Sequence, residues 1–146
     1  IGTKRMLEIL NRITEGNGTM EDLEELEELS NVVKSNSLCA LGQTAANPVI
    51  STLKHFRDEY IAHIQDKACP AKVCKSLINY TIDMDKCVSC ARCSKACPTG
   101  AIYKTDYIAP TNRFPSYQID DLKCLRCGAC IATCKLKAIN VESGRV

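Results

Sequence analysis

The chain has 146 residues, with 19 basic and 17 acidic side chains and a formal net charge of +2. This near balance does not suggest a nucleic-acid or anionic-membrane partner. No apolar run reaches the roughly 18 residues that a membrane span requires. The informative feature is the 11 cysteines. An odd number cannot all pair in disulfides, and the charged helical patterns are unlike a secreted disulfide scaffold. We therefore expect most of the thiols to bind metal.

Cysteine content and charge both change near residue 68. Residues 1–68 hold one cysteine, Cys39, with 7 basic and 11 acidic side chains, whereas residues 69–146 hold ten cysteines, with 12 basic and 6 acidic side chains. We therefore predict a small helical bundle over 1–68, a junction over 69–79, and a separate cysteine-rich domain over 80–146.

Three helices are predicted in the first part. The first has four apolar residues spaced to share one face: Met6, Ile9, Leu10 and Ile13. The second begins after Thr19, which suits an N-cap, and its many glutamates are expected to form a solvated face. The third begins at Asn47-Pro48, where proline suits the first helical turn, and is expected to continue to about Asp66.

The junction holds a group of residues typical of zinc ligands. His63 is followed by Cys69 and Cys74, and imidazole and thiolate are the donors that zinc prefers. We predict a zinc site from these three residues, completed by Glu59 or by an upstream residue. The alternative is that both thiols are simply packed and His63 is hydrogen-bonded.

The cysteine-rich part repeats itself at an offset of 37 residues. Each copy reads C-x2-C-x2-C-x3-C, and the equivalent positions include Lys86-Cys87 with Lys123-Cys124 and Ala101-Ile102 with Ala138-Ile139. Two copies of one supersecondary unit indicate a domain with pseudo-two-fold symmetry.

This spacing is typical of bacterial ferredoxins with two clusters. Three closely spaced thiolates wrap one cluster, and the fourth cysteine of the run reaches the cluster of the other repeat. The predicted ligand sets are Cys87, Cys90, Cys93 and Cys134 for one cluster, and Cys124, Cys127, Cys130 and Cys97 for the other. The alternative is two zinc sites, which would leave the third thiol of each run surplus.

Residues 80–142 resemble a bacterial-type ferredoxin domain with two [4Fe-4S] clusters. The resemblance implies an α+β fold with two short antiparallel hairpins and two helices, and strands near 101–103 and 116–119. One departure is Lys135, which follows Cys134 where the family usually has proline. Residues 103–116 exceed a minimal linker, and we expect an extended surface loop there.

Two strings in the first part also resemble a known family: Gly2-Thr-Lys-Arg-Met-Leu-Glu-Ile-Leu and Ser37-Leu-Cys-Ala-Leu-Gly-Gln-Thr-Ala-Ala-Asn-Pro48. They are similar to the C-terminal helical domain of the NADH-binding flavoprotein subunit of respiratory complex I. The similarity is greatest to beta subunits of NAD-linked, electron-bifurcating [FeFe] hydrogenases, which append a two-cluster ferredoxin domain.

That resemblance implies a role for Cys39 as the fourth ligand of a further [4Fe-4S] cluster. The other three ligands would precede Ile1, as would the FMN and NAD sites. The alternative is that Cys39 is a small buried apolar residue.

Together these features predict electron transfer through two [4Fe-4S] clusters inside a cytoplasmic oxidoreductase complex, with no catalytic residue in this chain. The resemblance implies a hydrogenase catalytic subunit, a thioredoxin-like [2Fe-2S] subunit and a flavoprotein core as partners. Two alternatives are a stand-alone ferredoxin-like carrier and a zinc-stabilised interaction module without redox activity. Nucleic acid is not expected, because the basic residues flank cysteines instead of forming a stripe with aromatic residues.

Overall fold

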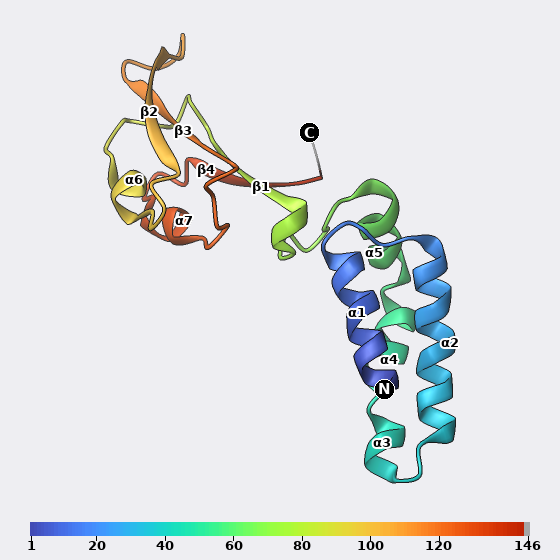
Figure 1. Ribbon diagram of the computed structural model, residues 1–146. Coiled ribbons are helices and arrows are strands. Elements are labelled where there is room, and N and C mark those ends of the chain that lie inside the picture. Colours follow the sequence, from blue (N-terminus) through green and yellow to red (C-terminus); the bar gives the residue numbers. More distant parts are fainter. Residues whose placement is uncertain (145–146) are drawn as a thin grey trace. The chain divides into compact units, whose positions relative to one another are not determined.

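The computed structural model describes residues 1–144. These residues form two compact units (Figure 1). The helical unit contains residues 1–77 together with 143 and 144, and the cysteine-rich unit contains Ile78–Glu142. Helices build the first unit, and short helices and strands build the second. The predicted α+β class is confirmed.

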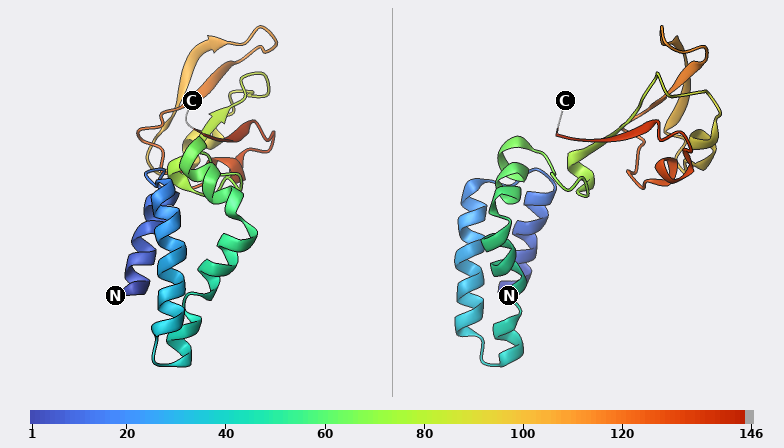
Figure 2. Two further views of the ribbon diagram at one scale, coloured as in Figure 1. Left: turned by 90° about the vertical axis from the view of Figure 1, so that its right-hand side faces the viewer. Right: turned by 180° about the vertical axis from the view of Figure 1, so that it is seen from behind.

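The helical unit is a small bundle in which α1 (Gly2–Thr14), α2 (Met20–Asn36) and α4 (Asn47–His55) lie side by side (Figures 1 and 2). A short α3 (Ala40–Thr44), absent from the sequence prediction, joins α2 to α4. The core is apolar: Met6, Ile9, Ile13, Leu23, Leu26, Ala46, Leu53 and Ile64. Burying each of the larger side chains stabilises the bundle by about 1.5–3 kcal/mol.

The turn between α1 and α2 depends on Gly16, whose φ is +82°. A side chain there would be strained, because L-residues rarely adopt that region. It would also meet Leu77, since a Cβ at this position would lie 2.7 Å from the Leu77 Cδ2 atom. Glycine is therefore required both by the backbone and by the close approach of Leu77.

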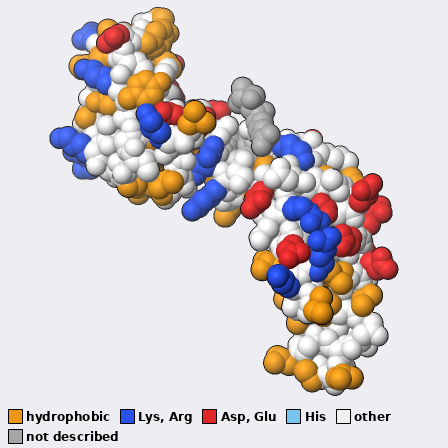
Figure 3. All heavy atoms as spheres, in the orientation of Figure 1, with side chains coloured by type: hydrophobic (Ala, Val, Ile, Leu, Met, Phe, Trp, Pro, Cys, Tyr) orange, Lys and Arg blue, Asp and Glu red, His pale blue; other side chains and the backbone are white. Residues whose placement is uncertain are grey.

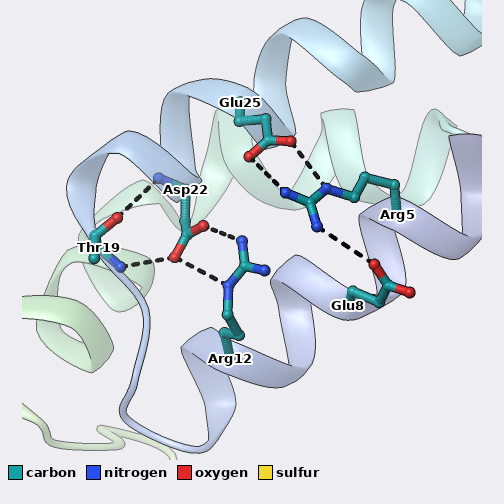
Figure 4. A network of polar contacts seen from close by, with 6 residues as sticks. All are labelled: Arg5, Glu8, Arg12, Thr19, Asp22 and Glu25. Atoms are coloured by element: carbon teal, nitrogen blue, oxygen red, sulfur yellow. Dashed lines mark hydrogen bonds and ion pairs between the residues drawn. The ribbon is translucent and has the colours of Figure 1, made fainter.

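A polar network fixes the start of α2 against α1 (Figure 4). The Asp22 amide donates to the Thr19 hydroxyl over 3.2 Å, and the Thr19 amide donates to the Asp22 carboxylate over 3.0 Å. This reciprocal pair is a capping box, which satisfies two amides that a helix start leaves free. The Asp22 carboxylate also pairs with Arg12, and the hydrogen bond from that guanidinium holds the pKa of Asp22 below its usual value.

The remaining acidic residues of α2 face solvent, as expected for its glutamates (Figure 3). Arg5 of α1 donates to Glu25 over 3.0 Å, and Arg57 donates to Glu27 over 2.7 Å. All four side chains are close to half exposed, so water screens these pairs and each stabilises the fold by at most about 1 kcal/mol.

The third helix is interrupted, and the prediction of one helix from Asn47 to Asp66 was wrong. The chain leaves helical geometry at Phe56, where φ is −131° and ψ is 30°. It resumes as α5 (Arg57–Ile61) and then widens into a π-helical turn (Ala62–Asp66). A 3-10 turn (Lys75–Leu77) ends the unit. Such π-helical turns often lie at functional sites, and this one contains His63.

The cysteine-rich unit has two helices and two small sheets. Strand β1 (Ile78–Ile82) pairs with β4 (Ile139–Ser143), and β2 (Ile102–Ile108) pairs antiparallel with β3 (Pro115–Ile119). One five-residue helix lies in each repeat: α6 (Arg92–Ala96) in the first and α7 (Ala129–Thr133) in the second. The two helices contact each other (Figure 1).

Residues 103–116 form a hairpin instead of the expected surface loop. Ile102 pairs with Ile119 and Ile108 with Pro115, with an irregularity in the register between Lys104 and Ile108. Pro115 is tolerated because it is the first residue of its strand. Ser116 is fully buried, and its hydroxyl lies 3.2 Å from that of Thr105. A polar contact thus reinforces the hairpin, and apolar periodicity alone does not predict it.

We expect Asp22→Asn to destabilise the helical unit by about 1–2 kcal/mol, because it removes the charge that pairs with Arg12 and weakens the cap. Urea unfolding of the full chain, followed by far-UV circular dichroism, measures this loss. The pKa of Asp22 is lowered in the fold from its ordinary 3.8. The stabilisation that the ionised Asp22 carboxylate provides is therefore complete above its ordinary pKa of 3.8, and it disappears as the pH falls through the lowered pKa of the folded state. The stability difference between wild type and variant should shrink at acidic pH.

Glu25→Gln is the matched control, because it removes an exposed ion pair between the same two helices. It should change stability by less than about 1 kcal/mol. Equal losses in the two variants would show that Asp22 acts as an ordinary surface charge.

Candidate metal centres

The first cavity of the cysteine-rich unit gathers four cysteines from both repeats. It is lined by Cys87, Cys90, Cys93 and Cys134, together with Tyr117 and aliphatic side chains. The first three lie in the turn before α6 and in α6 itself, and the fourth follows α7. The structure therefore brings together the residues that the spacing assigned to the first cluster.

The second cavity repeats this arrangement with the roles of the repeats exchanged. It is lined by Cys124, Cys127, Cys130 and Cys97, together with Tyr80 and aliphatic side chains. Tyr80 and Tyr117 lie at equivalent positions, 37 residues apart. Four thiols in each of two cavities are the donor set of a [4Fe-4S] cluster, and the residues present fit that group.

Left-handed backbone conformations lie between these cysteines in both repeats. Ser89 and its repeat equivalent Arg126 have φ values of +57° and +51°, and Ala91 and its equivalent Gly128 have +61° and +80°. Three of the four are not glycine, so most of these turns carry some strain. The same left-handed backbone at both pairs of equivalent positions indicates that the cysteine loops require these turns.

Burial raises the pKa of the Cys93 and Cys130 thiols, and the neighbouring cysteines add to the effect. Several thiolates would therefore repel one another in each cavity. Bound cations would remove that repulsion, which is a further reason to assign metal binding to these cavities.

Two residues that sequence reasoning missed hold the cysteine loops. Asn112, in the turn between β2 and β3, donates its side-chain amide to the carbonyls of Met84 and Cys87. Arg126, within the second loop, donates to the Ile78 carbonyl over 2.6 Å and to the Asn79 side chain over 3.2 Å. Their partners are main-chain or distant groups, so spacing along the chain gave no signal for either.

A third group of side chains, one that could hold a metal ion, lies within the helical unit. The ligand atoms of His63, Cys69 and Cys74 all lie within 4.8 Å of one another. The His63 Nε2 atom is 3.2 Å from the Cys74 sulfur, and its Nδ1 atom is 2.7 Å from the Glu59 carbonyl oxygen. Glu59 therefore orients the imidazole through its backbone, and its carboxylate is not part of the described group.

The two thiols of this group have opposite pKa shifts. Burial alone would raise the pKa of Cys69. The amides of Cys74 and Val73 donate to its sulfur over 3.5 and 3.4 Å, and these bonds, together with one from the Cys74 side chain, lower the pKa to about 7. Burial and the neighbouring Cys69 raise the pKa of Cys74 to about 11. Cys69 is thus prepared as a thiolate, the form that binds metal. The Cys69 amide and carbonyl both bond to the Ser143 hydroxyl, which fixes this segment.

Cys39 lies apart from these groups. It is exposed and caps α3, with its sulfur accepting from the Gly42 amide over 3.4 Å. The alternative of a buried apolar residue was therefore wrong. Within residues 1–144, Cys39 belongs to no group of three metal-binding side chains.

Comparisons with known families agree with this organisation. Residues 86–138 match the 4Fe-4S dicluster domain, and residues 1–63 match the NADH-ubiquinone oxidoreductase-F iron-sulfur binding region. The chain therefore matches a complex I flavoprotein-like subunit that carries a 4Fe-4S domain. The predicted resemblance is confirmed.

Three relatives illustrate the family. The chain is 51% identical over 105 residues to the NADP-reducing hydrogenase subunit HndC of Solidesulfovibrio fructosivorans, covering 72% of this chain and 21% of that protein. It is 45% identical over 69 residues to a subunit of the NADH-quinone oxidoreductase of Mycobacterium tuberculosis, covering 47% of this chain and 16% of that protein. It is 36% identical over 87 residues to the beta subunit of the NADPH-Fe(3+) oxidoreductase of Geobacter sulfurreducens, covering 59% of this chain and 13% of that protein.

The chain thus spans about a fifth or less of the length of these relatives. None of the helices in residues 1–144 combines the length and apolar character needed to cross a bilayer.

We expect Asn112→Ala to loosen the loop at Cys87 and to speed loss of iron from the first cavity when the protein is exposed to a chelator. The reason is that the variant releases the carbonyls of Met84 and Cys87 from their donor. Iron release followed by visible absorbance should become biphasic, with only one phase accelerated. Thr111→Val is the control from the same turn, because Thr111 bonds to the Asp85 carboxylate and not to the cysteine loop backbone. Equal acceleration by both variants would contradict a specific role for Asn112.

Proposed function

We propose that this chain carries electrons through two [4Fe-4S] clusters within an NADH- or NADPH-linked oxidoreductase complex. The observation that carries the proposal is the convergence of four cysteines from both repeats in each of two cavities. Bound [4Fe-4S] clusters supply reversible one-electron oxidation and reduction. The chain's own residues position them, shield them from water and donate hydrogen bonds to their sulfur ligands.

The assignment of ligands to clusters is part of the proposal. One cluster is held by Cys87, Cys90, Cys93 and Cys134, and the other by Cys124, Cys127, Cys130 and Cys97. The arrangement of the two cavities supports this exchange of the fourth cysteine. The alternative is that each repeat holds a cluster with its own four cysteines.

Pairs of substitutions distinguish these alternatives. With the exchange, Cys90→Ala and Cys134→Ala disable the same cavity, and the double variant should keep about four irons per chain. Cys90→Ala with Cys97→Ala disables both cavities and should keep almost none. Iron and acid-labile sulfide, measured on anaerobically prepared protein, report the result. The reverse pattern would establish that each repeat binds its own cluster.

We further propose that the complex is an NAD-linked, electron-bifurcating hydrogenase and that this chain belongs to its beta subunit. The 51% identity to a hydrogenase subunit over 105 residues supports this choice. The partners would be a hydrogenase catalytic subunit, a thioredoxin-like [2Fe-2S] subunit and a flavoprotein core that binds FMN and NAD, all in the cytoplasm. Cys39 would ligate a further [4Fe-4S] cluster with cysteines from that core.

The assembled complex provides the functional test. If electrons pass through this chain, Cys90→Ala with Cys97→Ala should stop electron transfer from NADH to hydrogen production while leaving flavin reduction by NADH intact. Hydrogen production with unchanged rate in that variant would exclude the proposed route. Production supported by NADH alone, without reduced ferredoxin, would exclude bifurcation.

A second candidate function is a structural zinc site formed by His63, Cys69 and Cys74. The proximity of one imidazole and two thiols supports zinc, which prefers these donors in structural sites. The Glu59 carbonyl bonds the remaining ring nitrogen of His63, a contact typical of zinc-binding histidines. A tetrahedral site would need one further ligand from outside this group.

We expect the native complex to hold one zinc at this position, and His63→Ala or Cys74→Ser to lose it. Zinc affinity should fall with decreasing pH, because imidazole and thiols must release protons to bind metal. Elemental analysis of the purified complex measures zinc directly. Cys39→Ser is the control, since that thiol lies outside the group, and it should leave the zinc content unchanged. Absence of zinc from native protein, or its retention in both site variants, would contradict the proposal.

A further inference from the structure

The two cavities differ at one position beside their fourth cysteine. In the second cavity, the Thr99 hydroxyl lies 3.6 Å from the Cys97 sulfur, and both residues line the cavity. The equivalent position in the first cavity, 37 residues later, is Leu136, which lines that cavity beside Cys134. A hydroxyl donor in one cavity is therefore replaced by an aliphatic side chain in the other.

The direction of the Thr99 hydrogen bond follows from the chemistry of the sulfur. A cysteine that ligates iron has lost its proton and can only accept, so the hydroxyl must donate. A donor that stabilises negative charge on sulfur also favours the more negative, reduced state of the cluster that the sulfur holds.

Backbone donors do not cancel this difference. Cys134 accepts from the Ala138 amide over 3.4 Å, and the Ala101 amide at the equivalent position likewise bonds Cys97. The second cavity has a further donor, since the Arg126 amide lies 3.4 Å from the Cys124 sulfur. Among the described residues, no such bond joins Ser89, the equivalent of Arg126, to Cys87.

The positive charges beside the two fourth cysteines differ, but water screens them. Lys135 and Lys137 flank Leu136 where the other repeat has Pro98 and Gly100, and both lysines are exposed. Arg92 lines the first cavity but is exposed, so water screens its charge. Arg126 lies between two cysteines of the second loop, where its guanidinium bonds to the Ile78 carbonyl. The exposed charges act through water, whereas the hydrogen bond from Thr99 acts directly on a sulfur and remains the clearest difference.

We propose that Thr99 makes the cluster held by Cys97, Cys124, Cys127 and Cys130 the stronger electron acceptor of the two. A single electron entering the unit then resides mainly on this second cluster, and the first cluster passes electrons toward it. Thr99 acts through the Cys97 sulfur and is a tuning residue, not a ligand. This inference rests on the proposed binding of two [4Fe-4S] clusters.

Exchange of the two equivalent residues tests the proposal. The full-length protein is titrated anaerobically with dithionite and mediators while electron paramagnetic resonance follows each cluster. Wild type should show two midpoint potentials. Thr99→Val should lower the higher potential alone, and Leu136→Thr should raise the lower potential alone. The expected shift is about 59 mV, a tenfold change in the one-electron equilibrium.

The control is Thr133→Val, beside Cys134. The Thr133 hydroxyl bonds to the Ala129 carbonyl over 2.9 Å and not to sulfur, so both potentials should stay unchanged. Iron and sulfide contents equal to wild type show that each variant folds and holds its clusters.

Two results overturn the proposal: one shared potential in wild type, or a Thr99→Val variant that leaves the higher potential unchanged. Either result, with about eight irons present, sinks the role of Thr99 while the two-cluster function stands. Failure of the proposed function is a separate result, namely wild-type protein without iron and labile sulfide.

Discussion

The exchange of the fourth cysteine between repeats is the constraint on which the cysteine-rich unit depends. Three thiols of each cavity come from one repeat and the last from the other. Because each cavity takes cysteines from both repeats, both repeats are needed to form either cavity. The small sheets and five-residue helices are too short to be stable in isolation. Cluster binding would then contribute directly to folding, as metal binding does in other small domains with little apolar core.

The helical unit is stabilised in a different way. Its eight buried apolar residues form a continuous core, and the Arg12, Thr19 and Asp22 network fixes the entry into α2. The group formed by His63, Cys69 and Cys74 lies where that regular packing ends, in and after a π-helical turn. The irregular backbone there places His63 close to Cys74, and the Ser143 hydroxyl holds Cys69. In the helical unit, this departure from regular helical geometry thus lies beside the group proposed to bind zinc.

The sequence predicted what depends on periodicity and spacing. Apolar spacing identified α1, and Thr19 as an N-cap identified the start of α2. The offset of 37 identified the repeat and the sets of cysteines that the structure gathers. Sequence could not predict the break at Phe56, because Asn47–Asp66 keeps a helical apolar pattern through it. The strands expected near 101–103 and 116–119 do pair. Sequence could not predict that this pairing continues to Ile108 and Pro115, because contacts between Thr105 and Ser116 stabilise strands that have no clear alternation. The roles of Asn112 and Arg126 depend on distant carbonyls, which local pattern does not encode.

Departures from the repeat are as informative as the repeat itself. Positions that must direct thiols inward keep the same backbone geometry in both copies, even where the residue changes from Ala91 to Gly128. Positions beside the sulfurs are free to differ without loss of the fold, as Thr99 and Leu136 do. Two clusters in identical surroundings would share an electron equally, and a chain of carriers would gain no direction from them. Because hydrogen bonds to sulfur change a potential without moving a ligand, substitution at such positions can create direction while the symmetric scaffold is retained.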